Sequence, residues 1–270
     1  MPEANTLDYK IYGNDLQYIE VALKPMQEVM AEQGAMMYLD QNITVDAVLG
    51  DGSSSKFGAV GRFFNAIKRT FTGESMFSSV YRNVANYEQN VALAAPSPGE
   101  IVPINLDEQG GMIICQKGAY LAGERGQKIQ LAFQKRVRVG FFGGEGFIMQ
   151  KISGKGTVFI HASGTLKQVA LAPNDVLKID TGCLVGMSSK VRYDIQYTGK
   201  LKTSFFGGEG MFYATVSGPG NVWIQSLQMS RLSRAIVGAA VSGRSSGSVW
   251  GKLYLIGIVL FVIFTFLAGR

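Results

Sequence analysis

The chain has 270 residues, of which 47% are apolar and only 17% charged, and it contains 34 glycines. This composition excludes a disordered or coiled-coil protein and favours a turn-rich β protein with a sizeable core. The net charge is +6, but five basic and no acidic residues lie beyond residue 230, so residues 1–230 carry only +1. A nearly neutral body is a poor match for nucleic acid, because phosphate contacts dominate that affinity.

The sequence repeats itself at an interval of 64 residues. FFGGEG at 141–146 recurs as FFGGEG at 205–210, and GKGTVFI at 154–160 recurs as GPGNVWI at 218–224. A degenerate third copy lies at the front of the chain. Repetition in a constant phase indicates one structural unit used three times. We therefore expect an all-β fold of three internally repeated units in a pseudo-threefold arrangement.

The first unit is expected over residues 1–101. Its FTGESMF at 71–77 resembles FGGEGFI in the second unit, and LGDGSSSKFGAVGR at 49–62 is an insertion. The stretch GRFFNAIKRTFTG at 61–73 has phenylalanines on one helical face and basic residues on the other. It predicts a short amphipathic helix, which either caps an open end of a sheet or lies on a membrane surface.

The second and third units are expected over residues 102–168 and 169–228. In the third, KVRYDIQY at 190–197 alternates polar and apolar residues, which is typical of a half-buried strand. Short apolar runs follow tight Gly-x-Gly turns in both units, as strands follow hairpin turns.

The glycine-rich hexapeptide is expected to be structural. A phosphate-binding loop runs from a strand into a helix, whereas both copies here are followed by strand-like sequence and no Lys-Ser or Lys-Thr pair. Glycines at the ends of short strands serve turns and bulges. The predicted corner residues are Gly73, Glu74, Gly143, Gly144, Glu145, Gly146, Gly207, Gly208, Glu209 and Gly210.

No catalytic motif is found in the sequence. The chain has one histidine, His161, whose counterpart in the third unit is Gln225, and its two cysteines, Cys115 and Cys183, lie in unrelated contexts. Metal-binding barrels use two or three histidines and a carboxylate. We therefore expect a non-enzymatic protein without a metal or a cofactor, with both cysteines reduced.

The end of the chain predicts a membrane anchor. After a basic, small-residue linker at 229–249, residues 250–269 contain the uncharged run LYLIGIVLFVIFTFLAG, which is long enough for a short span. Basic residues before this run place the body in the cytoplasm. The N-terminal MPEANTLDYK is polar and has no leader-like apolar run, which favours a prokaryotic protein. The predicted anchor residues are Leu253, Ile256, Val259, Phe261, Ile263, Phe266 and Leu267. The predicted interface residues are Arg244, Trp250, Lys252 and Tyr254. The alternative is an apolar helix in the core of an oligomer.

Three segments carry a resemblance to a known family. LQYIEVALKPMQEVMAEQGAMMYLD at 16–40, the paired FFGGEG corners and GPGNVWIQS at 218–226 resemble the altered-inheritance-of-mitochondria family of mitochondrial biogenesis proteins. The resemblance covers residues 7–228. It implies three β-sandwich units similar to subunits of the trp RNA-binding attenuation protein and grouped with double-stranded β-helix folds. It implies no catalytic residues, and association with the mitochondrial inner membrane in a eukaryote. Met26 departs from the family, which commonly has glycine there.

The leading hypothesis for function is a non-enzymatic, tail-anchored membrane scaffold. Its cytoplasmic body would form homo-oligomers and bind lipid or membrane proteins. A second hypothesis is a module that binds a small ligand or single-stranded RNA, with Lys135, Arg136 and Arg138 as its basic strand. The third is an enzyme in which the three corner glutamates converge.

Overall fold

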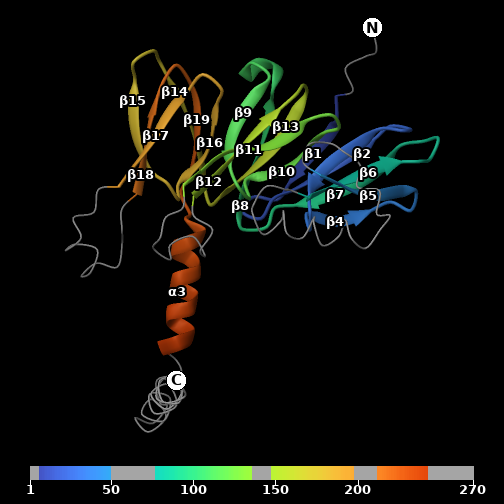
Figure 1. The fold of residues 1–270 in the computed structure, drawn as a ribbon. Coiled ribbons are helices and arrows are strands. Elements are labelled where there is room, and N and C mark those ends of the chain that lie inside the picture. Colours follow the sequence, from blue (N-terminus) through green and yellow to red (C-terminus); the bar gives the residue numbers. More distant parts are fainter. Residues whose placement is uncertain (1–5, 50–76, 136–146, 198–211, 243–270) are drawn as a thin grey trace, which may run out of the picture. The chain divides into compact units, whose positions relative to one another are not determined.

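The computed structural model describes residues 6–49, 77–135, 147–197 and 212–242. These contain nineteen strands, a 3-10 helix and one α-helix (Figure 1). We group the strands, in chain order, into three sets. The first set is β1 (Asp8–Tyr12), β2 (Tyr18–Leu23), β3 (Glu28–Glu32), β4 (Met36–Leu39), β5 (Ile43–Leu49), β6 (Phe77–Asn83) and β7 (Gln89–Ala94). The second set is β8 (Gly99–Asn105), the 3-10 helix η1 (Asp107–Gln109), β9 (Met112–Gln116), β10 (Tyr120–Glu124), β11 (Lys128–Lys135), β12 (Phe147–Ser153) and β13 (Thr157–Ser163). The third set is β14 (Leu166–Leu171), β15 (Val176–Asp180), β16 (Leu184–Ser188), β17 (Arg192–Tyr197), β18 (Phe212–Ser217) and β19 (Gly220–Gln225).

The predicted all-β architecture is confirmed, and the repeat is visible in the strands. β9 and β15, for example, begin and end 64 residues apart. Each set also repeats one bulge: a residue is skipped in the pairing of β4 with β7, of β10 with β13 and of β16 with β19. The same local geometry therefore recurs three times.

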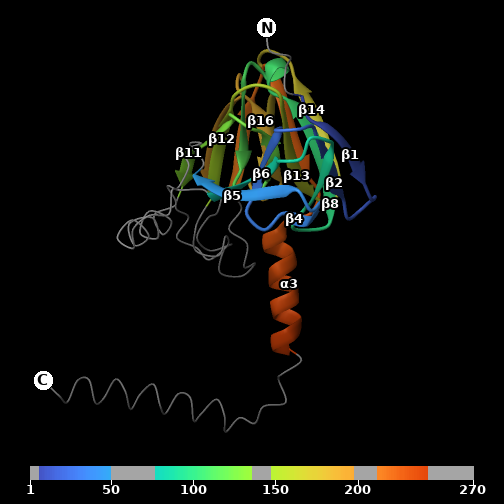
Figure 2. The ribbon, with the colours of Figure 1, turned by 90° about the vertical axis from the view of Figure 1, so that its right-hand side faces the viewer.

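The strands form four sheets, and two of them are shared between neighbouring sets. Their orders are β1-β2-β7-β4, β5-β6-β3-β10-β13-β8, β11-β12-β9-β16-β19-β14 and β15-β18-β17. The second sheet joins three strands of the first set to three of the second through β3 and β10. The third sheet joins the second set to the third through β9 and β16. In Figure 2 the first set faces the viewer, with β1, β2 and β4 labelled.

The space between successive sheets is filled by three apolar clusters. One is formed mainly by the first set and includes Ile19, Val91 and Leu93, a second is centred on Ile113 and Ile152, and a third on Met149 and Val222. Burial of the apolar side chains in these clusters is the main term that stabilises such a fold. The central strands of the two shared sheets, such as β3, β10 and β16, are therefore buried on both faces.

The departure from the family at Met26 has a structural counterpart. Met26 has φ 64°, in the left-handed region, and follows Pro25 in the turn between β2 and β3. The amide of Gln27 donates to the carbonyl of Lys24 at 3.0 Å, which closes the turn. A turn with Pro at its second position and a positive φ at its third prefers glycine at the third. The methionine therefore sits where glycine has the lower conformational cost.

The structure contradicts the predicted C-terminal transmembrane helix. In the described part of the chain, no helix is long and apolar enough to cross a membrane. The α-helix α3 (Met229–Ser242) has 14 residues, which span about 21 Å against a hydrocarbon core of about 30 Å. It occupies residues for which a linker was expected. The tail-anchored membrane localisation loses its structural support together with the helix. The predicted anchor residues at 253–267 and interface residues at 244–254 lie outside the described residues.

Candidate binding surface

The most distinctive surface of the body lies on the outer side of the sheet β1-β2-β7-β4. Along β2, Ile19, Val21 and Leu23 are fully buried, so the alternating Tyr18 and Glu20 face outward. Side chains of β1 and β4 lie on the same side of this sheet. We call the set Tyr12, Tyr18, Glu20, Met37 and Tyr38 the tyrosine face.

Glu20 organises this face. The hydroxyls of Tyr38 and Tyr12 both donate to the Glu20 carboxylate, the latter over 3.3 Å. The rings of Tyr12 and Tyr18 stack with centroids 5.1 Å apart and planes 14° apart. The contacts hold three aromatic rings around one carboxylate on a β-sheet, which is a more rigid platform than a loop.

The hydroxyls of Tyr12 and Tyr38 act as donors at neutral pH. The hydrogen bond to Glu20, together with partial burial, raises the pKa of Tyr38 to about 12. The pKa of Tyr12 is also raised, by burial first and then by the charge of Glu20. Both rings nevertheless remain accessible, since Tyr12 is 37% and Tyr38 39% exposed.

The apolar part of the face lies on β4, at the edge of the sheet. Met36, Met37 and Tyr38 are 47%, 54% and 39% exposed, and the strand MMYL has no charged residue. Natural edge strands are usually protected by charge, proline or a bulge; β4 has the bulge but neither a charge nor a proline. Exposed tyrosine and methionine are also enriched in the cores of protein interfaces. The composition of β4 therefore favours a binding role.

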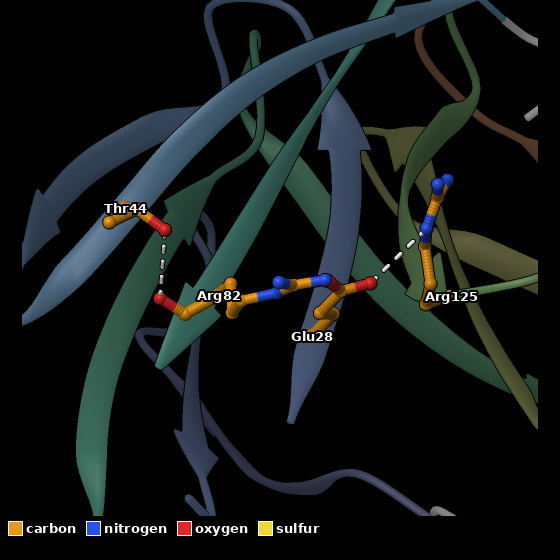
Figure 3. Close-up of polar contacts among 4 residues, drawn as sticks. All are labelled: Glu28, Thr44, Arg82 and Arg125. Atoms are coloured by element: carbon orange, nitrogen blue, oxygen red, sulfur yellow. Dashed lines mark hydrogen bonds and ion pairs between the residues drawn. The ribbon is translucent and has the colours of Figure 1, made fainter. Parts of the chain in front are cut away.

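The junction between the first and second sets is closed by an ion-pair cluster. Glu28 on β3 contacts the guanidinium of Arg82 on β6, and the Nε of Arg125, after β10, lies 3.2 Å from its other oxygen (Figure 3). The hydroxyl of Thr44 lies 3.5 Å from the carbonyl of Arg82. Because Glu28 and Arg125 come from different sets, this cluster bridges the two sets across the shared sheet. It has no further chemistry of its own.

His161 has a structural environment. It is 4% exposed, and its Nε2 donates to the carbonyl of Ser97 at 3.0 Å. Burial lowers its pKa, partly offset by that hydrogen bond. Cys115 is buried, and its burial raises the pKa of its thiol, whereas Cys183 is half-buried; neither forms a disulfide. Among the residues that the structure describes, no group of three histidine, cysteine or acidic side chains has a metal-binding arrangement.

The predicted corner residues, from Gly73 and Glu74 to Glu209 and Gly210, lie outside the described residues, as does the expected amphipathic helix at 61–73. The convergence of the three glutamates therefore stays a prediction. Of the basic strand, Lys135 ends β11, while Arg136 and Arg138 are likewise outside.

Sequence reasoning missed the tyrosine face. Its one signal was the alternation in YIEVAL, which places Tyr18 and Glu20 opposite the apolar residues of β2. The position of β4 at the edge of a sheet had no signal in the sequence.

The chain resembles known proteins over nearly all of the body. A family model described as "Mitochondrial biogenesis AIM24" matches residues 9–227. An uncharacterized protein of Streptococcus pyogenes serotype M6 is 28% identical over 218 residues, which cover 80% of this chain and 83% of the relative. The crystal structure of protein SPYM3_0169 from Streptococcus pyogenes superposes with a TM-score of 0.69 at 26% identity, covering 86% of this chain and 99% of the other.

Proposed function

Since the chain belongs to the mitochondrial biogenesis AIM24 family, as the match over residues 9–227 establishes, we propose that it is a non-enzymatic scaffold whose tyrosine face binds a protein partner. The observation that carries the proposal is the exposure of Met37 and Tyr38 on an uncharged edge strand. Tyrosines supply large, rigid contact area and a polar tip, which suits a protein interface.

The charge of the face favours protein over lipid or RNA. Glu20 lies among the three tyrosines, and a carboxylate repels both anionic headgroups and phosphates. A stacked pair such as Tyr12 and Tyr18 also suits a nucleobase, so binding of single-stranded RNA is the outcome to test against. The absence of enzymatic activity rests on the lack of any catalytic motif in the sequence.

A site-specific photo-cross-link tests the proposal. The full chain carries p-benzoylphenylalanine at position 37, and the control carries it at position 130, an exposed position on β11. After irradiation in cells that make the protein, we expect a protein adduct at position 37 and none at position 130. Equal adducts at both positions, or an adduct to RNA alone at position 37, would contradict the proposal.

A further inference from the structure

The two sheets shared between sets follow one pairing rule. β10 pairs with β3 in the register Ala122↔Ala31, Gly123↔Met30 and Glu124↔Val29. β16 pairs with β9 in the register Gly186↔Cys115, Met187↔Ile114 and Ser188↔Ile113. Residues 122–124 become residues 186–188 after a shift of 64. The junction therefore recurs with its register unchanged, one repeat further along the chain.

Two counterparts of the junction strands, β4 and β15, lie at sheet edges. β4 pairs with β7 through the bulge that β10 and β16 have, so it is the counterpart of those strands. β15 is the counterpart of β9, 64 residues later, and it pairs with β18. No other described strand pairs with β4 or with β15, and each ends its sheet. Among the described strands, β4 is thus a junction strand without the β3-type partner that β10 has, and β15 is a junction strand without the β10-type partner that β3 has.

The exposure of the bulge residue differs between the two internal junctions and the free strand β4. Leu121 on β10 and Val185 on β16 occupy the bulge, and both are buried, at 0% and 1% exposure, in clusters that include residues of the preceding set. Met37 occupies the same position on β4 and is 54% exposed. A position that is buried at both internal junctions is therefore open only where no preceding set exists.

We infer that the protein partner of the tyrosine face is a second copy of this chain, which adds its β15 antiparallel to β4. This inference rests on the proposed function and names its partner. The internal register, transferred to these strands, places Tyr38 opposite Ile179, Leu39 opposite Lys178 and Asp40 opposite Leu177. The joined sheet has the order β1-β2-β7-β4-β15-β18-β17, with the last three strands from the second copy. On β15, Val176 is 61% exposed and becomes part of the contact.

The interface joins two different surfaces, so each copy retains one free β4 or β15 after pairing. Such head-to-tail contacts generate closed rings or open filaments. An experiment can distinguish such a head-to-tail contact from a symmetric dimer. One chain carries a cysteine on β4, and a second chain carries a cysteine on β15.

Disulfide trapping tests the pairing and its register. One full-length chain carries Leu39→Cys and the other Lys178→Cys, both with Cys183→Ser so that buried Cys115 is the remaining native thiol. Directly opposite residues in antiparallel strands have Cα atoms about 4.5–5.5 Å apart, within the range of a disulfide. We expect a disulfide-linked dimer when the two chains are mixed and none from either chain alone. The matched control replaces Lys178→Cys by Val176→Cys, on the same side of β15; its diagonal separation of about 7–8 Å should reduce the dimer at least about tenfold.

Sedimentation of the full chain gives the second readout. Wild-type protein should associate as its concentration rises. Met37→Lys should stay monomeric, and Gln130→Lys, on β11, should behave as wild type, with unchanged circular dichroism in both. The inference is overturned if the mixed cysteine chains give no dimer, if either chain dimerises alone to the same extent, or if the Val176→Cys control traps equally well. A cross-link from position 37 to a different protein, without self-association, would retain the proposed function and reject the second copy. Neither adduct nor self-association would reject both.

Discussion

Leu121 and Met37 allow the importance of the junction to be measured within one chain. They occupy the same bulge in two strand sets, but Leu121 is fully buried and Met37 is 54% exposed. Leu121→Ala removes a buried side chain from the cluster that contains Phe159 and leaves a cavity, which costs about 2–5 kcal/mol of unfolding free energy. Met37→Ala should change it by less than about 0.5 kcal/mol in the monomer, since most of that side chain is already in water.

The assay is guanidinium unfolding followed by circular dichroism, at a protein concentration low enough to keep the chain monomeric. In thermal unfolding of the same variants, a loss of about 3 kcal/mol lowers the melting temperature of a body of this size by roughly 6–12 °C. Val185→Ala, at the third copy of the bulge, should cost about 2 kcal/mol, because it removes less buried apolar surface. Equal losses at Leu121 and Met37 would refute the reasoning that the preceding strand set buries this position.

Three further predictions concern single buried or strained positions. Burial lowers the pKa of His161 from 6.5, so the unfolded chain binds a proton that the folded chain resists; stability should fall below about pH 6.5 by up to about 1.4 kcal/mol per pH unit. His161→Gln, the residue type of its counterpart Gln225, should remove that slope in unfolding series from pH 7.5 to 5.0, and parallel slopes would count against it. Met26→Gly should raise the unfolding free energy by up to about 1 kcal/mol, because it relieves a positive φ at an exposed side chain; a loss would show that the methionine packs in an essential way. Gln150→Met should stabilise by about 1 kcal/mol, since neither amide atom of this fully buried side chain has a hydrogen-bond partner among the described residues; destabilisation would indicate a hidden partner.

The sequence predicts the strands better than their assembly. Repetition of GKGTVFI and GPGNVWI places the last strand of two sets, because a tight turn and an apolar run are local features. The sharing of sheets between sets is not local. On β3 the residues Val29, Met30 and Ala31 are all buried, so the strand lacks the alternation that marks a single buried face.

The tyrosine face was still less accessible to sequence reasoning. Met36 and Met37 look like ordinary core residues in a methionine-containing strand, and only the sheet order shows that they lie at an edge. The expected membrane helix illustrates the opposite error. A charge-free run satisfies the length rule in the sequence, whereas the helix among the described residues, α3, is too short to span.

Sharing sheets between repeats has a consequence for synthesis. The hydroxyl of Tyr120 donates to the carbonyl of Met30 across the first junction, between residues that are 90 positions apart. At about 5–20 residues per second, a ribosome needs roughly 5–20 s to supply that partner. During this interval the edge of β3 that pairs with β10 has no partner from its own chain. A β4 strand of a neighbouring chain has the same bulge as β10, so it can pair with this edge in the same interval, and slow synthesis of β10 favours pairing between chains.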